Sequence, residues 1–221
     1  ADKKQSAQLM HIATDGESYG HHHRFGDMAL AYALNYIESR GLAKITNYGE
    51  YLEKHPPEYE AVVYENTSWS CAHGVERWRS DCGCSNGANP GWDQKWRAPL
   101  RSALDWLRDQ LSEKYERASS EYFGDPWRAR DEYISVILDR SDENIARFFE
   151  GRGRRLEGTD TIKALKLLEL ERHSMLMYTS CGWFFDDVSG IETVQILQYA
   201  GRALQLAEEL FGDGLEQAFK D

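Results

Sequence analysis

The chain has 221 residues, enough for one domain with a sizeable core or for two small ones. Its net charge of −11 makes a nucleic-acid backbone a poor partner. No apolar run reaches the length of a membrane span and no signal peptide opens the sequence, so we expect a cytoplasmic protein without a membrane partner. Its four cysteines fit neither a dense disulfide framework nor a paired Cys-x-x-Cys zinc site, which favours reduced thiols.

The first stretch that could carry chemistry follows a short apolar run at residues 9–14, which has the length of a buried strand. If the backbone stays extended beyond this run, Asp15 and Glu17 point to the same side. Tyr19 and the histidines at 21–23 follow directly, and such groups can move protons at neutral pH. The alternative interpretation is a surface turn followed by a solvated histidine run.

Residues 1–65 alternate between strand-like and helix-like patterns, which is typical of an α/β layer. The expected elements are a strand at 9–14, a helix capped by Asp27 that stops at Gly41, a strand at 43–46, a helix capped by Asn47, and a strand at 61–64. The first helix would turn Leu30, Leu34 and Ile37 inward.

Residues 66–91 form a long segment that is rich in tryptophan, cysteine and arginine and has no predicted secondary structure. Disordered segments rarely carry these residues at such density, so we expect an ordered loop. Tryptophan and arginine suit the binding of a sugar or another flat, hydroxylated ligand. The alternative is that the tryptophans only bury the loop against the core.

The rest of the chain has helical patterns, and together they predict a bundle. Its signals are an apolar stripe from Trp92 through Leu104 to Tyr115, caps at Asp125 and Ser141, and helices over about 160–178 and 190–211. The segment at 179–187 interrupts the last two helices with a thiol, three aromatic residues and two acids.

In these motifs the sequence resembles glycoside hydrolase family 57, especially its α-glucan branching-enzyme-like relatives. The first similarity is Asp15-Gly16-Glu17-Ser18-Tyr19-Gly20-His21, which is similar to a motif at the end of a late strand of the family's incomplete (β/α)7 barrel. The similarity continues in order through 49–57, Thr67-Ser68-Trp69-Ser70, His73-Gly74, Trp78, Trp92, Trp96 and the segment 181–187.

The resemblance implies a mainly α fold, with a small α/β remnant of the barrel at 1–65, a Trp/Cys-rich loop at 66–91 and a helical bundle at 92–221. It also implies retaining chemistry on α-glucosidic bonds, in which one carboxylate attacks the sugar and a second acts as acid/base. Asp15 matches the acid/base, and Glu17 could raise its pKa. The family's nucleophile has no counterpart in this sequence.

The resulting prediction is the C-terminal portion of a retaining glycoside hydrolase or transglycosylase that acts on an α-glucan or oligosaccharide. The missing N-terminal barrel segment would be its partner, no cofactor is expected, and the chain alone should not perform the reaction. The predicted catalytic residues are Asp15 and Glu17, and the predicted substrate-binding residues are His21, His22, Trp69, His73, Trp78, Trp183 and Asp186.

Two alternatives stay open. One is a carbohydrate-binding or interaction module without catalysis, which would use Trp69, Trp78 and Trp183. The other is a metal-binding domain, because the chain offers many zinc ligands. These ligands are His11, the histidines at 21–23, His73, Cys71, Cys82, Cys84 and Asp15. The Cys82-x-Cys84 spacing is tighter than that of the usual zinc knuckle, so we predict no metal ligand.

Overall fold

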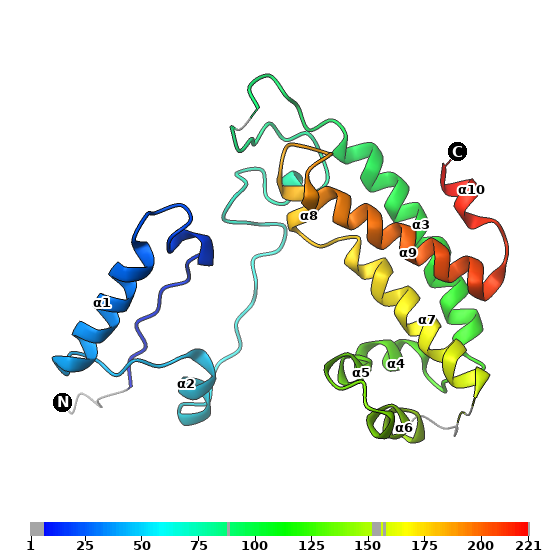
Figure 1. The fold of residues 1–221 in the computed structure, drawn as a ribbon, viewed down its shortest axis with the longest axis horizontal. Helices are drawn as coiled ribbons and strands as arrows, with labels where there is room; N and C mark the ends of the chain where they lie inside the picture. The colour runs from blue at the N-terminus through cyan, green and yellow to red at the C-terminus, as the bar shows by residue number, and fades with distance from the viewer. Residues whose placement is uncertain (1–6, 88, 152–155, 157, 221) are drawn as a thin grey trace. The chain divides into compact units, whose positions relative to one another are not determined.

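The structure is a computed structural model that describes residues 7–87, 89–151, 156 and 158–220. The chain divides into two compact units, residues 1–63 and residues 64–221, and each is described separately. The described residues are mainly helical, as predicted (Figure 1). No helix in the described part of the chain combines the length and the apolar character that a membrane crossing needs.

The described residues of the first unit, 7–63, contain two α-helices and one short 3-10 turn. These are η1 at Gly16–Ser18, α1 at Gly26–Ser39 and α2 at Tyr48–Lys54. The predicted cap of α2 is confirmed, because the Asn47 side chain accepts a hydrogen bond of 2.9 Å from the Glu50 amide. The predicted cap of α1 is wrong: Asp27 lies inside the first turn, and Phe25 occupies the cap position.

The three strands predicted at 9–14, 43–46 and 61–64 are absent from the described residues, where only an isolated bridge joins Tyr19 and His23. A strand forms by hydrogen bonding to a neighbouring strand, and nothing in the first unit offers one. Most of their apolar side chains are exposed instead, as Met10 shows with 99% of its surface accessible, although Leu9 and Ile45 are half-buried. No residue of α1 or α2 is buried.

The second unit is built on three long helices, α3 at Arg97–Ser119, α7 at Thr159–Leu176 and α9 at Ile191–Phe211. Helix α7 packs against both α3 and α9 (Figure 1). Apolar side chains that recur every three or four residues form the inner face of α3, namely Leu104, Leu107, Leu111 and Tyr115, and all four are buried. The predicted helical bundle is therefore confirmed, although α3 begins five residues after Trp92.

Five short helices complete the second unit. They are α4 at Pro126–Glu132, α5 at Ile134–Leu138, α6 at Asp142–Glu150, α8 at Cys181–Phe184 and α10 at Leu215–Lys220. The predicted caps are confirmed, because the side chains of Asp125 and Ser141 accept hydrogen bonds from backbone amides of α4 and α6. Helix α8 packs closely on α9, since a Cβ at Gly182 would overlap the side chain of Ile196.

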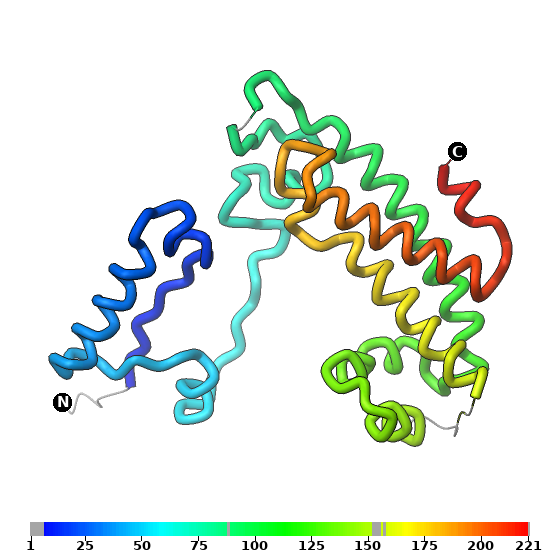
Figure 2. Tube along the Cα trace, viewed as in Figure 1, coloured from blue at the N-terminus to red at the C-terminus, as the bar shows by residue number. Residues whose placement is uncertain are grey.

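The Trp/Cys-rich loop, residues 66–91, precedes α3 and contains one short 3-10 helix, η2 at Glu76–Trp78. Helix α8 contacts η2, so the loop lies against the segment that joins α7 to α9. The trace in Figure 2 follows this loop to the end of the bundle where α8 lies. The fold thus brings two parts of the chain together that are about a hundred residues apart in sequence.

A core substitution should separate the bundle's apolar packing from its surface. We expect Leu107→Ala to lower the free energy of unfolding by about 2–5 kcal/mol, because Leu107 is fully buried and its truncation leaves a cavity. The matched control is Leu138→Ala on α5, where the leucine is 80% exposed and the change should be small. Urea unfolding followed by circular dichroism measures both, and equal losses would contradict this packing.

Candidate metal centre

Four side chains of the Trp/Cys-rich loop bring their ligand atoms together: Cys71, His73, Cys82 and Cys84 all lie within 4.8 Å of one another. The Cys71 sulfur is 3.9 Å from the sulfurs of both Cys82 and Cys84. The His73 Nδ1 atom lies 3.9 Å from the Cys71 sulfur and 3.5 Å from the Cys84 sulfur. All these cysteines are free thiols rather than disulfides.

These separations are close to those of a tetrahedral zinc site. With bonds of about 2.3 Å to sulfur and about 2.0 Å to nitrogen, a tetrahedron places two sulfurs about 3.8 Å apart and a sulfur about 3.5 Å from a nitrogen. Three separations of 3.9 Å and one of 3.5 Å lie within about 0.4 Å of that geometry, and the remaining ligand atoms lie within 4.8 Å of one another. In the described part of the chain, no other cluster of three or more His, Cys, Asp or Glu ligands was found.

Two glycines with positive φ shape the loop around these ligands. Gly74 follows His73 with a φ of 77°, and a Cβ there would overlap the carbonyl oxygen of Asn66. The turn is held by hydrogen bonds from the Gly74 amide to the Cys71 carbonyl and from the Ser68 hydroxyl to the Gly74 carbonyl. Gly83, with a φ of 80°, separates Cys82 from Cys84.

Buried polar contacts fasten the loop to the segment around α8. The Arg77 guanidinium donates to the carbonyls of Phe184 and Ser70 and lies 3.8 Å from the centre of the Phe184 ring. From the other side, the Asp186 carboxylate accepts hydrogen bonds from the Ser85 hydroxyl at 2.8 Å and the Asn86 amide at 2.9 Å. These partners follow Cys84 directly, so the ligand-bearing turn is attached at both ends.

The start of α3 contributes a second set of contacts to the same segment. Gln94 donates to the Asp186 carboxylate at 3.1 Å, and the Trp96 indole donates to the Asp186 carbonyl at the same distance. The buried Arg97 donates to the carbonyls of Phe184 and Phe185, each at 3.0 Å. The backbone from 184 to 186 therefore serves as an acceptor surface for both the loop and α3.

The protein environment favours a thiolate at Cys71. Burial raises the pKa of this thiol, but hydrogen bonds from the backbone amides of His73 and Arg77 and with the side chains of His73 and Cys82 together lower the pKa to about 7. At Cys82, burial raises the thiol pKa, and the neighbouring cysteines raise it further. A bound cation would favour the thiolate at each cysteine, because only the thiolate is a metal ligand.

The residues predicted to bind substrate in the second unit have different environments. Trp183 lies in the core with 0% of its surface exposed, and its indole donates to the Met177 carbonyl at 3.0 Å. Asp186 is also buried and is occupied by the contacts described above. Trp78 is half-buried against Phe184, and His73 belongs to the metal-ligand cluster. Trp69 is the one of these five that offers an open indole face, with 87% of its surface exposed.

The predicted catalytic residues lie in the first unit. Asp15 caps η1, where its carbonyl accepts from the Ser18 amide, and Glu17 lies within that turn. The rings of His21 and His22 contact each other edge to face with centres 4.8 Å apart. All four side chains are exposed. The predicted catalytic role of Asp15 and Glu17 and the predicted substrate-binding role of His21 and His22 stay predictions.

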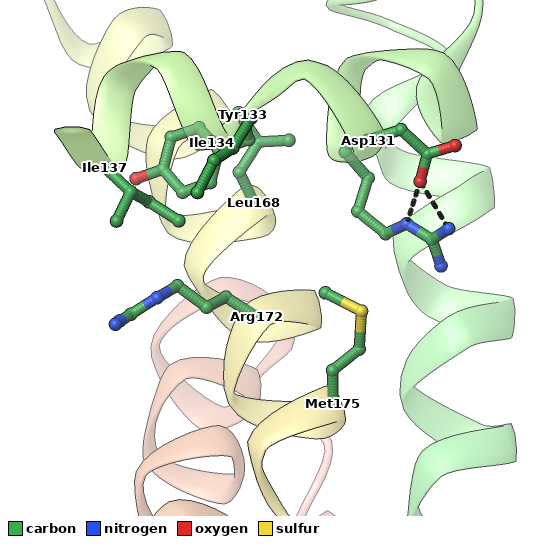
Figure 3. Close-up of a pocket in the computed structure, with 8 residues that line it drawn as sticks. Asp131, Tyr133, Ile134, Ile137, Leu168, Arg172 and Met175 are labelled. Atoms are coloured by element: carbon green, nitrogen blue, oxygen red, sulfur yellow. Dashed lines mark hydrogen bonds and ion pairs between the residues drawn. The ribbon is translucent and has the colours of Figure 1, made fainter. Parts of the chain in front are cut away.

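The second unit also has a hollow of about 280 Å³ between α4–α5 and α7. Figure 3 shows its walls, to which α5 contributes Ile134 and Ile137 and α7 contributes Leu168, Arg172 and Met175. Its charged groups already have partners: Arg130 pairs with Asp131, which also lines the hollow, and Arg172 pairs with Glu169. The hollow therefore lacks the convergent polar groups that a reactive site requires.

The sequence contains a pattern that indicates the metal-ligand cluster, but the expectation of Cys-x-x-Cys spacing excluded it. Each half of the cluster supplies two ligands that are two residues apart, as Cys71-x-His73 and Cys82-x-Cys84, and each half contains or precedes a glycine. A search restricted to Cys-x-x-Cys pairs misses this arrangement. The sequence shows neither the close approach of the two halves nor the contact between the loop and α8.

Comparison with known proteins identifies the helical part of the chain. The model of the family described as "Domain of unknown function (DUF3536)" matches residues 92–221, which include Arg97, Asp186 and all the long helices of the bundle. The metal-ligand cluster lies before the matched segment. No curated protein and no solved structure gives a significant match. Because the match covers more than half of the residues, the chain belongs to the DUF3536 family.

Proposed function

We propose that residues 64–221 form a zinc-binding module in which one Zn²⁺ ion joins the two halves of the Trp/Cys-rich loop. The ligands would be the Cys71, Cys82 and Cys84 sulfurs and the His73 Nδ1 atom. The observation that carries this proposal is the approach of four ligand atoms to within 4.8 Å of one another, four of whose separations are 3.5–3.9 Å. Thiolate and imidazole ligands in this number and geometry are typical of zinc.

The ligand count favours a structural role for the ion rather than a catalytic one. A catalytic zinc keeps an open position for water or substrate, whereas four protein ligands fill the tetrahedron. The loop also needs such support, because Cys71 is its only described apolar residue that is fully buried. Structural zinc contributes directly to the free energy of folding. The ion would hold the loop in the shape that its contacts with α8 require.

Metal analysis of the purified 221-residue chain tests the proposed zinc site. We expect about one zinc per chain, lost on treatment with a strong chelator and regained on adding Zn²⁺, because a tetrahedral site takes one ion. Cys84→Ser should lose most of this zinc. The matched control, Cys181→Ser, should keep it, since Cys181 is exposed and lies outside the cluster. A chain that takes up no zinc, or equal zinc in both variants, would refute the site.

A second candidate function is the one that the family 57 resemblance implies. We propose that the chain is the C-terminal portion of a retaining glycoside hydrolase or transglycosylase acting on α-glucans, with Asp15 as acid/base. Two observations favour it: Trp69 has an open indole face that could stack on a sugar, and residues 10–14 of the apolar segment are exposed. Such a segment would become a barrel strand once a neighbouring strand paired with it.

Activity measurements test this second candidate. The 221-residue chain should not turn over α-glucans, and a longer protein that supplies the other barrel strands should do so. In that protein, we expect Asp15→Asn to lower the rate by about a hundred- to ten-thousand-fold, the usual worth of general acid–base assistance. The variant should melt near the parent temperature, because the exposed Asp15 contributes little packing. Full activity of Asp15→Asn would rule out its role as acid/base.

A further inference from the structure

A second hollow in the bundle differs from the one between α4–α5 and α7, because several cations line it together with apolar side chains. It has a volume of about 210 Å³ and lies where α5, α6, α7 and α9 meet. The described residues on its walls include three cations, Arg140, Lys166 and Arg202, and one carboxylate, Glu169. This positive lining contrasts with the chain's net charge of −11. A cleft lined by one sign of charge attracts ligands of the opposite sign, here anions.

Two of the cations share a single carboxylate. The Lys166 ammonium on α7 lies 2.8 Å from the Glu209 carboxylate, and the Arg202 guanidinium on α9 lies 3.4 Å from it. Arg202 contacts Glu209 and Gln205 through the same nitrogen, Nη1, at 3.4 Å and 3.3 Å. The side chains of Lys166, Arg202 and Glu209 are 38–45% exposed. Because exposed ion pairs contribute little stability, the head group of an anion can join or replace Glu209 at small cost.

The carboxylate that lines the hollow is held more firmly. The Glu169 side chain is 19% exposed and accepts hydrogen bonds from the Tyr133 hydroxyl at 2.7 Å and from Arg140 at 2.8 Å. It also pairs with Arg172 at 3.1 Å. Burial raises the pKa of Glu169, but these three donors together lower it below its usual value. An incoming anion is therefore directed to the two cations on α7 and α9 instead.

The rest of the lining is apolar and partly open to solvent. Val136 and Leu206 are each only 1% exposed. Ile145 and Leu165 are half-buried, and Ile162, in the first turn of α7, leaves 55% of its surface exposed. An apolar group that covers Ile162 gains free energy by removing this surface from water. The hollow therefore suits a ligand that combines an apolar body with a charged end.

We propose that this hollow binds a small organic anion, whose carboxylate or phosphate group contacts Lys166 and Arg202 and whose apolar body covers Ile162. The guanidinium of arginine can donate two parallel hydrogen bonds to either head group, and the lysine ammonium adds a point charge. The volume of about 210 Å³ is below the range of pockets for drug-sized ligands, so the apolar body is short. Neither function proposed above uses this site.

Binding of two six-carbon anions to the full 221-residue chain tests the site. Hexanoate is the carboxylate probe and hexyl phosphate is the phosphate probe. We expect at least one of them to shift the amide resonances of residues 162–166 and 202–206 in a saturable NMR titration, and the tighter one identifies the head group. Hexanol lacks the charge, and acetate and inorganic phosphate lack the apolar body, so each should bind at least about 10-fold more weakly.

Two variants locate the bound anion. Arg202→Gln removes the charge and should weaken binding about 10- to 100-fold, because a hydrogen bond to a charged group is lost. The matched control is Arg117→Gln on α3, where an exposed arginine also pairs with a glutamate, Glu113, but does not line the hollow. This control should bind the anion as the parent does. Ile162→Ser should weaken binding about 5- to 10-fold by removing apolar contact area.

Each outcome decides the proposal. It is overturned if neither anion binds saturably, or if hexanol binds as tightly as the anions. Equal affinities of Arg202→Gln and the parent, or equal losses in Arg202→Gln and Arg117→Gln, would place the anion elsewhere on the surface. If Arg202→Gln melts far below the parent, Ile162→Ser decides instead, since its exposed side chain contributes little to folding. None of these results changes the test of the zinc site, which is metal content.

Discussion

The buried carboxylate of Asp186 is the contact on which the arrangement of the second unit depends. It follows α8 and accepts hydrogen bonds from Ser85, Asn86 and Gln94, all of which precede α3. Without this carboxylate, several donors would lose their acceptor, and an unpaired buried polar group costs about 1–3 kcal/mol. The carbonyls beside it accept from Arg77, Arg97 and Trp96. One short segment therefore organises both the loop and the start of the first long helix.

The second unit uses two different means of stabilisation. The helices are held by apolar packing, in which α7 contributes to both neighbouring interfaces and the side chains of α3 recur at helical spacing. The loop before α3 follows the opposite pattern, because Arg77 is buried while Trp69 is exposed. Polar contacts of this kind have directional requirements, and a metal ion with four fixed ligands meets the same need. The ion would give the loop the rigidity that the helices obtain from their core.

The sequence predicts the helices of this chain better than the rest of the fold. Spaced leucines and the caps at Asn47, Asp125 and Ser141 act locally, so their signals are readable without knowledge of distant residues. A strand depends on a partner elsewhere, and the apolar run at 9–14 has the right pattern without the partner. The same limit explains Trp183 and Asp186, since their residue types suggested a binding surface and only the packing of α8 directs them inward.

The separation of contacts along the chain has a consequence for the order of folding. The proposed metal ligands Cys71 and Cys84 are 13 residues apart, whereas the contact between Asn86 and Asp186 spans 100 residues. Closing a short loop costs less entropy and occurs faster than joining distant segments. The metal-ligand turn can therefore form while the helices are still assembling. The turn would then already be folded when it meets Asp186. In this order of folding, the buried Arg77 and Arg97 would meet the carbonyl of Phe184 only when the last helices dock.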